Sequence, residues 1–151
     1  MTHLLFCITL AWLFPVSPSA ITISPMSNPA VASLTIDVSG VKERKGKLQV
    51  ALYNSAKDFP ETKPYRGEVL NITADNKLQV IFKDLPPGNY AVAVYHDKNS
   101  NGKLDKNLLG IPVEDYGFSN DARGTRLSAP SFDDTKLRVE NQPVRLKIEV
   151  R

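Results

Sequence analysis

Cysteine, tryptophan and histidine are scarce in this chain of 151 residues, which contains one Cys, one Trp and two His. The single cysteine, Cys7, cannot form a disulfide within the chain, so core packing and any bound metal must stabilise the fold. Only one histidine, His96, lies outside the N-terminal region, and no Gly-x-Ser-x-Gly motif or phosphate-binding loop accompanies it. These absences argue against the common hydrolase and nucleotide-binding sites.

The chain also lacks a strong charge of one sign. It has 19 Lys and Arg against 16 Asp and Glu, a formal net charge of +3. Because nucleic-acid-binding proteins carry a much larger basic excess, we expect no nucleic-acid partner. The densest basic cluster, residues 42–47, is interpreted as the solvated turn of a hairpin.

Residues 1–20 are predicted to be a cleavable secretory signal peptide. An apolar run from Leu4 to Phe14 is followed by proline and small residues up to Ala20, which suits a signal peptidase. The run is shorter than the ~20 residues that span a bilayer, so we expect no stable membrane insertion. We therefore expect the mature protein in the periplasm or outside the cell. We also expect it to be a monomer. It has a flexible leader, residues 21–33, and one domain, residues 34–151.

Alternation of apolar and polar residues predicts an all-β domain, since no segment shows a helical period over three turns. About seven short strands in a chain of this size favour a single antiparallel β-sandwich. We expect the first two strands to form a hairpin and the strand at 90–95, apolar on both faces, to be central. The predicted strands span residues 34–40, 48–52, 68–73, 78–82, 90–95, 136–139 and 144–150.

The sharpest chemical signal is the loop that follows the predicted central strand. Side chains that carry oxygen alternate along it, and Gly102 stands where the chain must turn, in the order of an EF-hand-type calcium loop. Calcium prefers such oxygen ligands and needs six to eight of them. The predicted calcium ligands are the side chains of Asp97, Asn99, Asn101 and Asp105 and the main-chain carbonyl of Lys103.

This calcium template is incomplete. Leu108 occupies the twelfth position, where a bidentate carboxylate normally completes the coordination sphere. Candidates to replace that carboxylate are Glu114, Asp115 and Asp121 in the following segment. With two acids in the loop, calcium would bind weakly, in the millimolar range of extracellular modules. The alternative interpretation is a polar turn whose Asn and Asp side chains bond to their own backbone.

The segment of residues 107–135 contains too many large apolar side chains for a disordered linker. Loops of this length are usually functional or packed on their own side chains, and we expect this one to pack against the Asp/Asn-rich loop. Arg123 and Arg126, with Tyr116 and Phe118, are candidates for an acid- or sugar-binding surface. The alternative is that the aromatic rings close the end of the sandwich. The predicted ligand of the 107–135 loop is an unknown small molecule, glycan or protein.

Six stretches follow one another in order along the chain: Leu85–Tyr90, His96–Asp97 with Asn99, Asn101–Asp105, Leu109–Pro112, Tyr116–Asn120 and Pro130–Asp134. Together they resemble the domain of unknown function 2141 family of uncharacterised secreted bacterial proteins. This resemblance extends from about Leu34 to the C-terminus, with Asp115 where a small residue is expected. It implies a secreted sandwich of prealbumin-like or immunoglobulin-like type without an established activity. The Leu-Pro-Pro-Gly-x-Tyr turn is also similar to surface-adhesin B-type repeats and carboxypeptidase regulatory-like domains, which are binding or spacing modules.

The expected function is therefore that of a non-catalytic binding or structural module. The alternative is a small hydrolase centred on His96, with Ser119 or Ser131 as its nucleophile. Such a hydrolase requires the histidine and a serine to meet in space, which sequence separation does not reveal. A third interpretation is a purely structural envelope module that binds neither an ion nor a small molecule.

Overall fold

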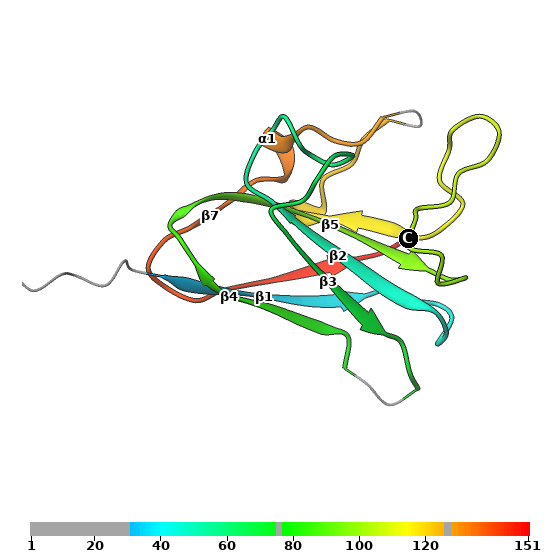
Figure 1. Ribbon diagram of the computed structural model, residues 1–151, viewed down its shortest axis with the longest axis horizontal. Helices are drawn as coiled ribbons and strands as arrows, with labels where there is room; N and C mark the ends of the chain where they lie inside the picture. The colour runs from blue at the N-terminus through cyan, green and yellow to red at the C-terminus, as the bar shows by residue number, and fades with distance from the viewer. Residues whose placement is uncertain (1–30, 75–76, 126–127) are drawn as a thin grey trace, which may run out of the picture.

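The computed structural model describes residues 31–74, 77–125 and 128–151 (Figure 1). The predicted signal peptide, with Cys7, lies outside these residues, as do Arg126 and residues 21–30 of the predicted leader. The chain folds into two β-sheets, of three and five strands, which confirms the predicted all-β sandwich. Among the described residues, no helix is long and apolar enough to cross a membrane.

Within the described residues, eight strands and two short helical segments form this sandwich, in close agreement with the predicted strands. The first strand begins two residues earlier than expected, and three elements, β6, η1 and α1, lie inside the segment predicted as a long loop. The elements are β1 (Ala32–Ser39), β2 (Lys47–Tyr53), β3 (Arg66–Asn71), β4 (Gln79–Leu85), β5 (Gly88–Asp97), β6 (Tyr116–Phe118), η1 (Ser119–Asp121), α1 (Phe132–Thr135), β7 (Leu137–Val139) and β8 (Val144–Glu149).

The strand order is β4-β1-β8 in one sheet and β3-β2-β5-β6 in the other, with β7 also paired to β5. The strand β5 is central, as predicted, because β2 lies along one edge and β6 and β7 share the other. The last strand, β8, lies at a sheet edge and runs parallel to β1. Every other pairing of the named strands described here is antiparallel.

The predicted hairpin between the first two strands is wrong. Strand β1 pairs with β4 and β8, whereas β2 pairs with β3 and β5, so the basic segment of residues 40–46 crosses from one sheet to the other. Gly46, at φ +76°, lies so close to the main chain of β5 that a Cβ would be 2.3 Å from the carbonyl oxygen of Asp97. A side chain at this position would therefore be strained both in conformation and in space.

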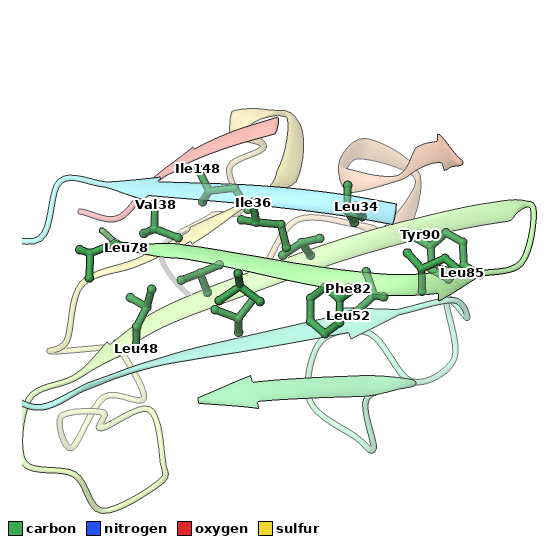
Figure 2. Packing of buried hydrophobic residues seen from close by; sticks show 14 of the residues in the cluster. Leu34, Ile36, Val38, Leu48, Leu52, Leu78, Phe82, Leu85, Tyr90 and Ile148 are labelled. Atoms are coloured by element: carbon green, nitrogen blue, oxygen red, sulfur yellow. The ribbon is translucent and has the colours of Figure 1, made fainter. Parts of the chain in front are cut away.

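Apolar side chains from both sheets meet between them and form the core (Figure 2). Alternate residues of β1 and β2 point inward, which follows from the two-residue period of a strand. Phe82 of β4 and Leu52 of β2 are fully buried from opposite sheets. The inward residues labelled in Figure 2 are Leu34, Ile36, Val38, Leu48, Leu52, Leu78, Phe82, Leu85, Tyr90 and Ile148.

A buried serine ties the segment after β6 to the central strand. The hydroxyl of Ser119 accepts a hydrogen bond from the main-chain N–H of Val92 at 2.9 Å and donates one to the carbonyl of Thr135 at 2.6 Å. Ser131 begins α1 with a capping box, in which its hydroxyl accepts from the N–H of Asp134. These bonds fix the segment beside the outer face of the five-stranded sheet.

Candidate functional site

A groove lies on the outer face of the five-stranded sheet, where two residues with small side chains lie opposite each other. Ala51 of β2 pairs with Ala93 of β5, and Phe118 of β6 pairs with Ala93 on its other side. The adjacent inward residues belong to the core, so both alanines face outward. Tyr53 and Tyr95 stand on the same face, two residues beyond each alanine. The sheet is therefore shallow at the alanines and flanked by aromatic rings.

Three connecting segments lie over this face of the sheet (Figure 1). Their residues form the walls of the groove. The cavity has a volume of about 420 Å³, within the range of small-molecule sites. The lining residues from the walls are Pro60 and Glu61 from the β2–β3 connection, Leu104, Lys106, Gly110 and Pro112 from the β5–β6 connection, and Gly124, Thr125, Ser128 and Ala129 from the segment before α1.

Tyr53 joins the first wall to the floor. Its hydroxyl donates a 2.6 Å hydrogen bond to the carbonyl of Pro60. Its ring packs edge-on against Phe59, with 5.3 Å between ring centroids, and Phe59 in turn contacts Phe118 and Phe132. Burial raises the pKa of Tyr53, so the hydroxyl stays protonated and keeps this bond at neutral pH.

The groove carries little net charge. The charged residues among its described lining are Glu61 and Lys106, which form a 3.5 Å ion pair between two walls. The hydroxyls of Tyr95 and Tyr116 have no hydrogen-bond partner in the described part of the chain. Burial, followed by the carboxylates of Asp97 and Glu114, raises the pKa of Tyr95. Its phenol is therefore available as a hydrogen-bond donor to a ligand.

The predicted calcium loop forms the base of the second wall. Asp97, the last residue of β5, is fully buried on the outer face of the sheet. Its carboxylate accepts hydrogen bonds from the main-chain N–H groups of Asn101 and Gly102 and from the side chain of Gln49, at 2.8–3.0 Å. Burial alone would raise the pKa of Asp97, but these hydrogen bonds outweigh it and hold the pKa below its usual value.

Among the other predicted ligands, the side chains of Asn99, Asn101 and Asp105 do meet. The side-chain amides of Asn99 and Asn101 donate to its two carboxylate oxygens at 2.7 and 3.0 Å. Their own Oδ1 atoms accept from the N–H groups of Asn101 and Lys103. The loop thus has the polar-turn arrangement in which Asx side chains satisfy their own backbone. Nothing in these contacts tests whether calcium binds, so the calcium ligands stay a prediction.

Of the three acids considered as the missing ligand, Glu114 is the one that reaches the loop. It is buried, and its two oxygens accept from the N–H groups of Lys98 and Asp105 at 2.8 and 3.0 Å. Asp115 instead pairs with Lys42 and Lys98, and Asp121 pairs with Arg151 and Arg123. In the described residues, no group of three or more His, Cys, Asp or Glu side chains could hold a metal ion.

The Asp/Asn-rich loop and the next segment pack together, as predicted. The N–H of Val113 donates to the carbonyl of Asp105 at 2.9 Å, and Lys106 forms a β-bridge with Pro112. The residues between Lys106 and Pro112 form a tight turn, in which the side chain of Asn107 accepts hydrogen bonds from two main-chain N–H groups. Leu108 at its tip is fully exposed, so this part of the segment does not pack on its own apolar side chains.

His96 and the two serines of the hydrolase alternative have separate structural partners. The His96 ring is fully buried, with Nε2 2.8 Å from the carbonyl of Lys45 and with Nδ1 unpartnered among the described residues. Ser119 bonds to β5 and to Thr135, and Ser131 caps α1. These contacts do not bring either serine hydroxyl to the histidine.

The residues predicted to form an acid- or sugar-binding surface do not all line the groove. Tyr116 and Phe118 line the groove and are in edge contact, with 5.8 Å between ring centroids. Arg123 lies beside a neighbouring cavity of about 240 Å³ and pairs with Asp121 at 3.7 Å. Arg126 falls outside the described residues.

The groove floor was not anticipated from the sequence. The available signal was a tyrosine two residues after an outward alanine in each of two apolar strands, Ala51 with Tyr53 and Ala93 with Tyr95. Only the register of β2 on β5 shows that the two alanines are opposite.

Comparisons with known proteins identify a domain family but give no activity. The model of a family described as "Uncharacterized protein conserved in bacteria (DUF2141)" matches residues 36–147. No curated protein and no solved structure matches the chain. The groove and the Asp/Asn-rich loop of residues 97–105, called the acidic loop below, both fall within the matched range.

Proposed function

The chain belongs to the DUF2141 family, and we propose that it is a non-catalytic binding module that takes a small, uncharged ligand in the groove of the five-stranded sheet. The observation that carries this proposal is the outward pair Ala51 and Ala93, which leaves a depression between tyrosine rings. Pockets that bind small molecules are concave, largely apolar and equipped with a few polar groups. The groove has all three properties.

Binding without catalysis is favoured by the chemistry of the groove. Its described lining offers tyrosine hydroxyls, the hydroxyls of Thr125 and Ser128, and one internal ion pair. It includes neither His96 nor Ser119. A nucleophile and its base must lie within hydrogen-bond reach of each other. The proposed place of action is the periplasm or the cell exterior, because residues 1–20 fit a secretory signal peptide.

Weak calcium binding by the Asp97–Asp105 loop is the second candidate function. In its favour, the amides of Asn99 and Asn101 both point at the Asp105 carboxylate. Rotating each amide by half a turn exchanges Nδ2 for Oδ1 and would turn two more oxygens toward the same centre. Glu114 lies against this loop and adds a carboxylate. The proposed role of the ion is to stiffen the wall of the groove.

The experiment that tests the groove is NMR mapping of a fragment mixture with neutral, acidic and basic members. Neutral fragments should shift the amide signals of Ala51, Ala93 and Tyr95, and Ala93→Leu should abolish those shifts by filling the floor. Val69→Leu is the control, since Val69 is exposed on the same sheet and the substitution places a leucine outside the groove. Shifts that spread over the surface, or that survive Ala93→Leu, would refute the proposal.

A further inference from the structure

Because of how charge, aromatic rings and hydroxyls are distributed in the groove, we infer that its ligand is a neutral carbohydrate, a deduction that rests on the binding function proposed above. Three properties of the site lead to this class of ligand. They are the internal neutralisation of its charges, the spacing of its rings and the presence of unpaired hydroxyls.

The charges of the groove neutralise each other before any ligand arrives. Glu61 and Lys106 pair at 3.5 Å, and their side chains are 76% and 44% exposed. A carboxylate or phosphate ligand would have to compete with Glu61 for the one lysine of the described lining. An amine ligand would have to compete with Lys106 for the one carboxylate. Charged ligands usually meet an uncompensated group of opposite sign, so a neutral ligand fits better.

The rings are spaced to hold a flat apolar face between them. Tyr53 is opposite Ala91, and Tyr95 is opposite Gln49, so the two tyrosines are four residue positions apart along the strands. At about 3.3 Å per residue this separation is about 13 Å, with only alanine side chains between. Tyr116, opposite Tyr95, extends the aromatic row. A pyranose ring presents a face of C–H groups that lies well on alanine and against aromatic rings.

The hydroxyls of the groove complete the argument. Tyr95 and Tyr116 offer phenols without a partner among the described residues, and each can donate and accept. Ser128 and Thr125, whose hydroxyls bond to each other at 2.8 Å, line the wall formed by the segment before α1. A sugar has many hydroxyls around its apolar face and can bond to the tyrosine hydroxyls and to this wall at once. A purely hydrocarbon ligand would cover the hydroxyls of Tyr95 and Tyr116 without offering them a hydrogen-bond partner, which is unfavourable.

The test is NMR titration of the protein with three neutral disaccharides, namely cellobiose, maltose and N,N′-diacetylchitobiose. We expect at least one to shift the Ala93 and Tyr95 amides with saturation. Ala93→Leu should weaken that binding by about tenfold or more, and Val69→Leu should leave it unchanged. Tyr95→Phe, which removes one hydroxyl and keeps the ring, should weaken it severalfold. The acidic disaccharide digalacturonate and the amine glucosamine should bind at least tenfold more weakly.

The outcomes separate this inference from the proposed function. If neutral fragments bind at Ala93 but no neutral saccharide does, the carbohydrate inference is overturned, while the proposal that the groove binds a small, uncharged ligand is retained. If digalacturonate or glucosamine binds best, the inference is also overturned, because the ion pair does not exclude charge. If neither fragments nor saccharides bind there, both proposals fail.

Discussion

The side chain of Gln49 donates a 3.0 Å hydrogen bond to the buried carboxylate of Asp97 and so joins the groove floor to the loop that walls it. Gln49 lies on the outer face of β2, two residues before Ala51. The same carboxylate holds the turn at Asn101 and Gly102. Loop structure and groove shape are therefore linked through one side chain.

Asp97→Ala should destabilise the protein by about 1–3 kcal/mol, because it leaves the partly buried Gln49 amide and two main-chain N–H groups without their acceptor. Urea unfolding at neutral pH measures this loss. The matched control is Asp133→Ala, which removes an exposed aspartate and should cost little. Equal stability of the two variants would show that the Asp97 contacts contribute nothing.

Stability should fall in acid in a way that depends on Asp97. Hydrogen bonds hold its pKa below the ordinary value of 3.8, so the folded state binds a proton less readily than the unfolded state. Its contribution is therefore fully present above the unfolded pKa and is lost as the pH falls through the lower, folded pKa. The melting temperature, followed from about pH 5 down to pH 2, should decline less steeply in Asp97→Asn than in the unmodified protein. Parallel declines would contradict the assignment.

Glu114→Ala should loosen the second wall of the groove. The Glu114 carboxylate bonds the N–H groups of Lys98 and Asp105, which lie at the two ends of the acidic loop. Without it, hydrogen exchange at those two amides should accelerate, while exchange at core positions such as Val92 should change less. Glu61→Ala, which removes an exposed wall carboxylate, is the control. Unchanged exchange at Lys98 and Asp105 would show that the wall is held by other contacts.

The calcium proposal predicts a higher melting temperature in millimolar calcium than in chelator, since an ion that binds the folded state stabilises it. Asp105→Asn should abolish this shift because Asp105 is the residue on which both amides converge. Asp133→Asn should retain it. No shift up to about 10 mM calcium would leave the loop as a self-bonded polar turn.

The strands could be predicted because their signal is local, whereas the pairing of strands could not. The alternation of Leu34, Ile36 and Val38 is read directly from neighbouring residues, and it gave β1. The prediction of a hairpin between β1 and β2 was wrong, because a short polar connection fits either a hairpin or a crossover between sheets. The groove depends on Ala51 meeting Ala93 across 42 positions of sequence, so its position requires the register.

In the acidic loop, too, the sequence predicted the local turn but not the contact with a residue outside it. Its Asx pattern correctly indicated a tight turn that brings Asn99, Asn101 and Asp105 together. The pattern could not show which of Glu114, Asp115 and Asp121 reaches the turn. That choice follows from β6, which begins at Tyr116 and pairs with the end of β5, so that Glu114 lies beside Lys98.

His96 offers a direct comparison of a structural role with a catalytic one. Its ring is fully buried and its Nε2 lies 2.8 Å from the carbonyl of Lys45, so His96→Ala should leave a cavity and an unpaired acceptor. We expect a loss of roughly 2–4 kcal/mol in unfolding free energy, typical of large-to-small core substitutions. Saccharide binding at Ala93 should persist at temperatures where the variant is folded, because the ring does not line the groove. The opposite result, full stability with loss of ligand turnover or binding, would favour the hydrolase alternative.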